Sequence, residues 1–271
     1  MGNYRNRLVV CYRHPDRETG VSCQRCGRFI CPECQISNAV GYLCPEDGRV
    51  TVATRIKNDT RATLTIGLIL VTVLVYVGQL MSNGEVTYSL IYSPNLTISE
   101  PWRMLTAGFL HSESSFMHIA LNMYSLYIFG SVLEPLLGKA RFLALYLLAI
   151  FGGSVAVLLF DAPNSLVLGA SGGIFGLMGA YFVILRSLGQ GGGQLTAIIG
   201  LNLVIGFLPG LNIAWQAHIG GLIVGGIVAF AYARTRAPKD KSKQQLYVIA
   251  VAVALIVLTV FGASLLPVSG Y

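Results

Sequence analysis

ATLTIGLILVTVLVYVGQLM, residues 62–81, is an apolar run long enough to cross a lipid bilayer. A helix that spans the hydrocarbon core needs about 20 mainly apolar residues. Six further segments approach this length, at about residues 116–133, 142–160, 168–185, 195–211, 217–233 and 246–266. The two shortest contain glycines, and one contains a histidine, so they need neighbouring helices for stability. The sequence therefore predicts an all-α polytopic membrane protein with seven transmembrane helices.

The composition of the whole chain agrees with this class. Of its 271 residues, 54% are hydrophobic and only 11% are charged, and its mean hydropathy is +0.64. Such values are atypical of soluble globular domains. The net charge of +7 does not indicate nucleic-acid binding, because the basic residues lie along the chain at the ends of apolar segments. We therefore expect the lipid bilayer, and no nucleic acid, as the environment of this chain.

The positive charges also predict an orientation. The first residues lack the apolar core and cleavage site of a secretory signal, so we expect a cytoplasmic N-terminus. Ten of the nineteen Lys and Arg residues precede residue 62. With seven crossings, every remaining basic residue except Arg103 falls on the cytoplasmic side, which follows the positive-inside rule. The sequence thus predicts a multi-pass protein of the cell membrane with its C-terminus outside.

Residues 1–61 differ from the rest, because they hold all six cysteines and no spanning segment. In a reducing cytoplasm these cysteines favour metal ligation over disulfides. Four pairs of possible ligands, each with two residues between its members, indicate zinc binding. The pairs are Cys11 and His14, Cys23 and Cys26, Cys31 and Cys34, and Cys44 and Asp47. The alternative is a disordered tail with reduced cysteines.

The spacing of these pairs resembles the B-box type of zinc finger, in which pairs one and three share one metal and pairs two and four share another. This implies one or two structural zinc ions. The second site would include Asp47, a harder ligand than thiolate, so it would be weaker or vacant. A domain of about 40 residues has too little core to fold unaided, so metal would stabilise it. We expect a regulatory role, with a cytoplasmic protein as a possible partner.

Polar residues within the predicted spans are few, and such residues usually have a function. They are His118, Asn122, Ser171, Asn202 and His218. The second, fourth and sixth spans run from outside to inside. The polar residues at or near their starts should therefore lie at a similar depth near the outer face. Asn202 is interpreted as a polar contact between helices.

The types and spacing of these residues suggest chemistry. His118 and Asn122 are four residues apart and share a helix face. Ser171 lies at the start of a helix within GASGG, where free N–H groups favour a developing negative charge. His218 can reach Ser171 only if the two helices pack closely. Small residues at helical spacing favour this packing: they are Gly172, Gly176, Gly179, Gly221 and Gly225.

From about residue 60 to 235 the chain resembles the rhomboid family of intramembrane serine proteases. The matching pieces follow the family order: Trp102 and Arg103, His118 and Asn122, Gly169 to Gly172, and Ala217, His218, Gly221 and Gly225. His111 and Glu134 also fall where the family often has such residues. The soluble-hydrolase pattern GxSxG also matches residues 169–173, but that motif needs a strand, a turn and a helix. No strand is evident here.

The resemblance implies a Ser171–His218 dyad, without a third acid and without a catalytic cofactor. His118, Asn122 and the Ser171 backbone N–H would bind the oxyanion. Phe175 would pack on the His218 ring, and residues 209–216 with the end of the fifth helix would cap the site. The substrates would be single-span or multi-span membrane proteins, cleaved near the outer face.

The predicted organisation has four parts. Residues 1–50 form the zinc-binding domain, 51–61 a linker, 62–235 the six-helix protease core, and 236–271 a basic loop with a seventh helix. One alternative is a catalytically inactive relative that binds membrane proteins for quality control, although both dyad residues are present. A channel or transporter is disfavoured, because the polar residues cluster at one depth.

Overall fold

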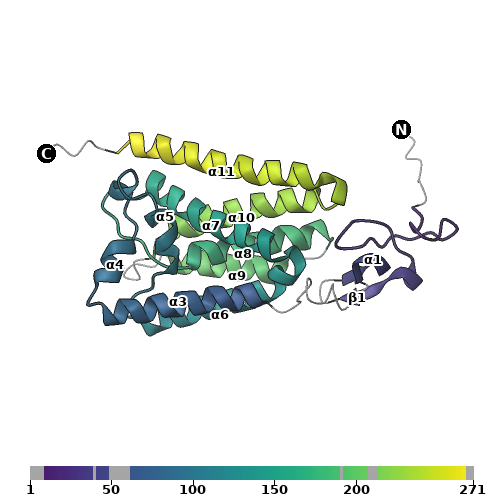
Figure 1. Ribbon diagram of the computed structural model, residues 1–271, viewed down its shortest axis with the longest axis horizontal. Coiled ribbons are helices and arrows are strands. Elements are labelled where there is room, and N and C mark those ends of the chain that lie inside the picture. Colours follow the sequence, from purple (N-terminus) through teal and green to yellow (C-terminus); the bar gives the residue numbers. More distant parts are fainter. Residues whose placement is uncertain (1–8, 39–40, 49–61, 190–191, 207–212, 267–271) are drawn as a thin grey trace. The chain divides into compact units, whose positions relative to one another are not determined.

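The computed structural model describes residues 9–38, 41–48, 62–189, 192–206 and 213–266 (Figure 1). The chain divides into two compact units. The first comprises residues 1–60 with 235–244, and the second comprises residues 61–234 with 245–271. The predicted linker 51–61 lies outside the described residues.

The first unit contains a small N-terminal module with little regular structure. It has η1 (Pro32–Cys34), β1 (Ile36–Asn38), β2 (Gly41–Leu43) and α1 (Pro45–Gly48). The two strands form an antiparallel hairpin in which Ile36 pairs with Leu43. The buried core of this module consists of the six cysteines, Ile30 and Leu43. So few apolar side chains bury too little surface to stabilise a fold alone, which agrees with a need for metal.

The second unit is helical, and a helix covers the described part of each of the seven predicted spans; residues 207–211 of the fifth lie outside the described residues. Among the described residues, five helices are long and apolar enough to cross a membrane: α3 (Thr63–Met81), α6 (Phe116–Leu137), α7 (Lys139–Phe160), α10 (Trp215–Arg234) and α11 (Lys241–Ser264, which begins in the first unit). The other two apolar helices, α8 (Ser171–Ser187) and α9 (Gly193–Gly206), are shorter. The architecture is therefore that of an all-α polytopic membrane protein.

The outer faces of these helices remain apolar, as a bilayer requires. Leu74 of α3, Tyr124 of α6 and Val260 of α11 are each more than 60% exposed. Large contiguous apolar surfaces are rare on soluble monomers and mark membrane or protein contacts. Contact with lipid explains why hydrophobic side chains lie on both the inside and the outside of this unit.

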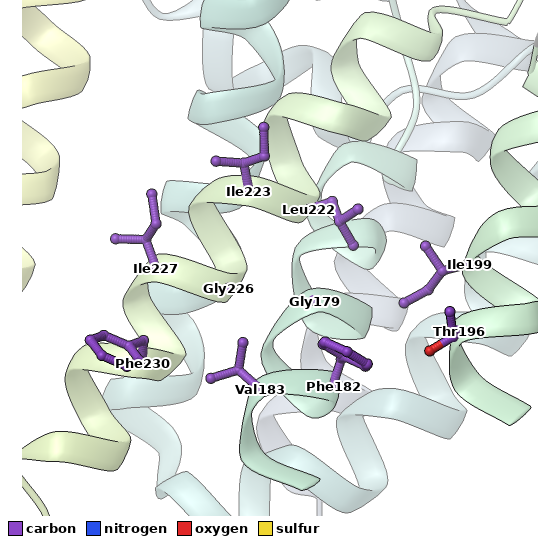
Figure 2. Close-up of a pocket in the computed structure, with 10 residues that line it drawn as sticks. All are labelled: Gly179, Phe182, Val183, Thr196, Ile199, Leu222, Ile223, Gly226, Ile227 and Phe230. Atoms are coloured by element: carbon purple, nitrogen blue, oxygen red, sulfur yellow. The ribbon is translucent and has the colours of Figure 1, made fainter. Parts of the chain in front are cut away.

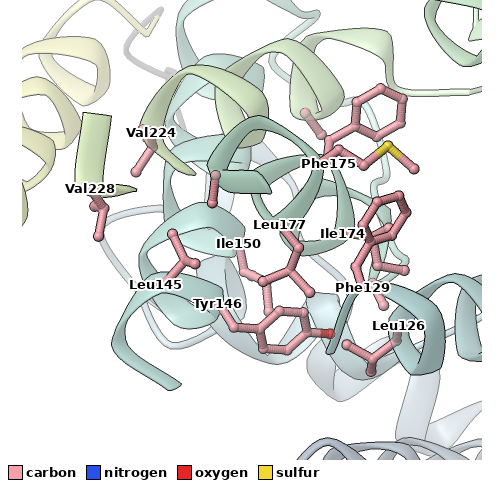
Figure 3. Close-up of a cluster of buried hydrophobic side chains, with 14 of the residues drawn as sticks. Leu126, Phe129, Leu145, Tyr146, Ile150, Ile174, Phe175, Leu177, Val224 and Val228 are labelled. Carbon is pink, nitrogen blue, oxygen red and sulfur yellow. The ribbon is translucent and has the colours of Figure 1, made fainter. Parts of the chain in front are cut away.

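Helix α8 lies at the centre of the core, packed against α7 and α10 (Figures 1 and 3). Side chains of α6, α7, α8 and α10 interdigitate there, among them Leu126, Tyr146, Leu177 and Val228, all buried. The central position of α8 fixes the place of its first residue, Ser171.

The contact between α8 and α10 confirms the expected close packing of glycines. A Cβ atom added at Gly221 would overlap the carbonyl oxygen of Gly172, and one at Gly225 would overlap that of Gly176. Backbone therefore lies directly on backbone along two turns. Only residues without a side chain permit this approach, which is the usual role of small residues between membrane helices.

The long loop between α3 and α6 is ordered. It contains α4 (Glu85–Leu90), η2 (Pro94–Leu96), α5 (Arg103–Thr106) and η3 (Ala107–Phe109). Arg103 is buried, pairs with Glu100, and donates to the carbonyls of Tyr88 and Ile91. Arg103 therefore stabilises the loop from within, whereas Trp102 remains half exposed.

Candidate active site

Ser171 and His218 lie within hydrogen-bonding distance. Ser171 Oγ is 2.9 Å from His218 Nε2, although 47 residues separate them in the sequence. Ser171 is the first residue of α8, and His218 lies in the first turn of α10. The glycine contacts between Gly172 and Gly221 lie beside this pair and hold the two helices together. The predicted nucleophile and base thus meet where two parallel helices begin.

Packing sets the orientation of the His218 ring. The Phe175 ring stacks on it, with centroids 4.2 Å apart and planes 12° apart. The other ring nitrogen, Nδ1, is buried and has no hydrogen-bond partner among the described residues. Gly206, the last residue of α9, lies beside this nitrogen, because a Cβ there would be 3.8 Å from it. Residues 207–212, in the predicted cap, lie outside the described residues.

His118 faces the same point from α6. A Cβ added at Gly169 would lie 3.1 Å from His118 Nε2 and 3.7 Å from Ser171 Oγ. Gly169 has φ of +130°, a conformation that residues with a side chain rarely adopt. Glycine is thus required here twice, by its backbone conformation and by the space that the imidazole occupies.

A backbone contact determines which nitrogen of His118 carries the proton. The Ser112 N–H donates to His118 Nδ1 over 3.2 Å. In a neutral imidazole the nitrogen that accepts has no proton, so Nε2 carries it. This nitrogen and the Ser171 hydroxyl oxygen both lie within 4 Å of the position that a Cβ on Gly169 would take.

Asn122 and Asn202 differ in their surroundings. Asn122 is buried, and its Nδ2 donates to the His118 carbonyl over 2.8 Å, which leaves its second amide hydrogen for another acceptor. Asn202 is exposed and donates to the Ile198 carbonyl of its own helix. Within the described residues it makes no hydrogen bond to another helix.

Gln79 is a residue of this region that the sequence analysis missed. It is fully buried in α3, accepts from the His111 N–H and donates to the His111 carbonyl, both over 3.0 Å. The next residue is Ser112, whose N–H bonds His118. A glutamine within an apolar span was the available signal, because such groups need a partner.

Comparison with known proteins identifies the family. A model of the rhomboid domain matches residues 99–235, about half of the chain. The chain belongs to the rhomboid family. Characterised rhomboids are serine proteases that act on membrane proteins within the bilayer, although some members are inactive.

Individual rhomboid relatives align over the same region. RHOMBOID-like protein 6, mitochondrial, of Arabidopsis thaliana is 38% identical over 139 residues, which are 49% of this chain and 44% of that protein. Rhomboid protease GluP of Bacillus subtilis is 38% identical over 148 residues, 52% of this chain and 27% of GluP. YdcA of Bacillus subtilis is 32% identical over 144 residues, 51% of this chain and 71% of YdcA. The chain thus spans less than half of the first two relatives.

The N-terminal module of this rhomboid lies outside the family match, and it contains two groups of possible metal ligands. One consists of Cys11, His14, Cys31 and Cys34, and the other of Cys23, Cys26, Cys44 and Asp47. In each group the ligand atoms lie within 4.8 Å of one another. The grouping is the one that the B-box resemblance implies.

The separations of these ligand atoms fit a tetrahedral metal. Ligands about 2.0–2.3 Å from a zinc ion lie about 3.3–3.8 Å apart at the corners of a tetrahedron. His14 Nδ1 lies 3.3 Å from Cys31 Sγ and 3.4 Å from Cys34 Sγ. In the second group the Cys26 and Cys44 sulfurs are 3.8 Å apart. The donors of both groups therefore suit zinc in type and spacing.

Arg28 adjoins the second group and was not selected from the sequence. Its Nε donates to Cys26 Sγ over 3.2 Å, and its Nη2 to Cys44 Sγ over 3.5 Å. Burial raises the pKa of the Cys26 thiol to about 12, although the bond from Arg28 opposes this. Arg28 therefore favours the thiolate form that a metal needs at the site with the carboxylate ligand.

Proposed function

We propose that this chain is an intramembrane serine endopeptidase that cleaves single-span or multi-span membrane proteins near the outer face of the cell membrane. The observation that carries the proposal is the 2.9 Å separation of Ser171 Oγ and His218 Nε2 at the start of two tightly packed helices. A nucleophile within hydrogen-bonding distance of a base is the arrangement that covalent catalysis requires.

The proposed reaction has two stages. Ser171 Oγ bonds to the scissile carbonyl carbon while its proton passes to His218 Nε2, and the carbonyl oxygen takes up the negative charge. His218 then gives this proton to the leaving amine as the C–N bond breaks. A water molecule next attacks the resulting ester, again with His218 as base, and its product is a free acid with the serine restored.

The donors around Ser171 would stabilise the oxyanion. His118 offers Nε2–H because its Nδ1 accepts from Ser112, Asn122 has an uncommitted amide hydrogen, and the Ser171 N–H lies at a helix N-terminus. Such fixed dipoles act strongly where water is excluded. No metal or cofactor enters the proposed reaction. The Phe175 ring, which stacks on His218, would keep the base aligned without a third acidic residue.

The proposed orientation places the N-terminus in the cytoplasm and the C-terminus outside. It rests on the distribution of basic residues, of which only Arg103 falls on the outer side. Arg103 does not contradict this orientation. It forms a buried ion pair with Glu100 inside the loop, so its charge does not act as a cytoplasmic anchor.

The N-terminal module is proposed to be a cytoplasmic zinc-binding domain with up to two structural ions. Cys11, His14, Cys31 and Cys34 would hold one ion, and Cys23, Cys26, Cys44 and Asp47 the other. Each ion would supply folding free energy, because the module has a very small core. Closed four-ligand sites are structural, so the module would recruit a cytoplasmic protein or regulate the protease.

The decisive experiment is proteolysis in reconstituted membranes. The purified full-length protein is incubated with a generic single-span substrate, and the wild type is compared with Ser171→Ala and His218→Ala. We expect cleavage by the wild type alone, with all three proteins inserted and equally stable. Cleavage by either variant would contradict the dyad.

The alternative is an inactive member of the family that binds membrane proteins for quality control. It predicts that the wild type and Ser171→Ala bind a membrane protein equally and that neither cleaves it. The short Ser171 to His218 distance disfavours this alternative.

A further inference from the structure

An apolar groove of about 440 Å³ lies on the second unit (Figure 2). Helices α8, α9 and α10 form it. Its lining consists of Gly179, Phe182, Val183, Thr196, Ile199, Leu222, Ile223, Gly226, Ile227 and Phe230. Thr196 is the only one with a polar side chain, and its hydroxyl donates to the Gly192 carbonyl of its own turn. The groove therefore offers an occupant almost no hydrogen bonds.

The groove extends away from the dyad: its lining begins with Leu222, one turn after His218 on α10. Gly179 is eight residues beyond Ser171 on α8, a distance of about 12 Å along the helix axis. Water is a poor occupant of an apolar groove, because it needs several polar partners. An empty groove would forfeit dispersion contacts. In a bilayer, the available occupant of such a groove is an apolar chain.

Two arginines lie at the end of the groove that is farther from Ser171. Arg186 is in the last turn of α8, and Arg234 is the last residue of α10. In the register that places Gly172 beside Gly221, these two arginines lie at nearly the same level. The Arg234 guanidinium lies 5.0 Å from the centroid of the Phe230 ring, which itself lines the groove.

Both guanidinium groups are available to a ligand. Arg186 and Arg234 are exposed, and neither has a carboxylate partner in the described part of the chain. Guanidinium binds phosphate oxygens in a bidentate manner. An apolar groove that leads to two such groups at a helix end is complementary to a single lipid molecule. The groove matches the acyl tail, and the guanidinium groups match an anionic headgroup.

We propose that this groove binds an anionic phospholipid, with one acyl chain between α9 and α10 and the phosphate at Arg186 and Arg234. The charge selects an anionic headgroup over a zwitterionic one, as basic residues at a membrane surface generally do.

The first test fills the groove. A Cβ at Gly226 would lie 3.7 Å from Val183 Cγ2, an ordinary contact, so Gly226→Leu should extend into the groove without separating α8 from α10. The matched control is Gly67→Leu on α3, where a Cβ meets nothing within 4 Å. Both substitutions add the same side chain to a transmembrane helix.

The second test removes the charge. A double variant, Arg186→Gln with Arg234→Gln, is compared with Lys139→Gln and Arg141→Gln at the start of α7. The control pair is exposed and is expected on the same side of the membrane. The loss of net charge is therefore equal in the two proteins.

The measurement is native mass spectrometry of the full-length protein in mild detergent, titrated with phosphatidylglycerol or phosphatidylcholine. We expect one phosphatidylglycerol, retained at least about tenfold more tightly than phosphatidylcholine. Gly226→Leu should lose that lipid, the Arg186 and Arg234 double variant should lose the preference between the lipids, and both controls should behave as the wild type.

Three results would overturn the proposal: equal binding of the two lipids by the wild type, retention of phosphatidylglycerol by Gly226→Leu, or equal loss in the charge controls. A photo-cross-linker at Ile223 shows whether a lipid or a substrate helix occupies the groove. Attachment to a lipid supports the proposal, and attachment to a substrate helix contradicts it.

Discussion

Replacing Gln79 with Leu should slow cleavage although Gln79 touches neither Ser171 nor His218. Its amide holds the His111 backbone through two hydrogen bonds of 3.0 Å. The following N–H, from Ser112, bonds His118 Nδ1 and so keeps the proton on Nε2. Leucine fills the volume of glutamine but makes neither bond. The loop should then shift, and His118 should populate both tautomers.

The structure sets the size of this effect. A hydrogen bond such as that from Ser112 to His118 contributes about 0.5–1.5 kcal/mol net, which corresponds to about a 2- to 12-fold preference for one tautomer. Without the bond the two tautomers become about equally populated, so the active fraction falls to about half, and we expect kcat to fall at most about twofold, with little change in KM. Stability should fall as well, because the buried N–H and C=O of His111 each lose a partner at about 1–3 kcal/mol.

The assay must distinguish a change in the His118 tautomer from a loss of stability of the Gln79→Leu protein. Kinetics are measured in liposomes below the unfolding temperature of the variant, and nitrogen-15 NMR of histidine-labelled protein reports the tautomer, since the chain has only four histidines. The control is Thr72→Val on the same helix, because the only bond of the buried Thr72 hydroxyl to a described residue goes to the Leu68 carbonyl one turn earlier. A folded Gln79→Leu protein with wild-type kcat and a single His118 tautomer would refute the reasoning.

The remaining predictions concern the oxyanion site, the helix contact and the metal module. Asn122→Ala should leave slow, measurable cleavage, about 100- to 1000-fold below wild type, because other donors remain; an unchanged rate would remove Asn122 from the site. Gly221→Val should abolish cleavage and lower the melting temperature, since its Cβ would overlap the Gly172 carbonyl and separate the dyad. Arg28→Gln should weaken one of two bound zinc ions about 10- to 100-fold by native mass spectrometry and leave the other unchanged, whereas Asp47→Cys should strengthen that same ion. Equal effects on both ions would contradict the assignment of Arg28 to one site.

The sequence predicted the features that depend on local pattern. An apolar length of about 20 residues marks a span wherever it occurs, and helices cover the described parts of all seven predicted spans. The glycines of α8 and α10 also follow a local rule, since small residues at helical spacing mark a close helix contact. Their observed contact confirms the expectation, and the predicted approach of His218 to Ser171 depends on it.

The sequence did not reveal the residues that act on the candidate sites indirectly, by positioning or bonding another residue of the site. Gln79 and His111 are 32 residues apart and Arg28 and Cys44 are 16 apart, and no periodicity links either pair. In the sequence neither Gln79 nor Arg28 stands out. A glutamine near a helix end resembles a residue at the membrane surface, and an arginine in a basic segment resembles an orientation signal. Only the fold reveals that the glutamine is buried and fixes a loop, and that the arginine bonds two sulfurs. Position along the chain determines which helices form, whereas the partners of buried polar groups determine how those helices become a site, because a buried polar group without a partner costs about 1–3 kcal/mol, more than a hydrogen bond contributes on balance.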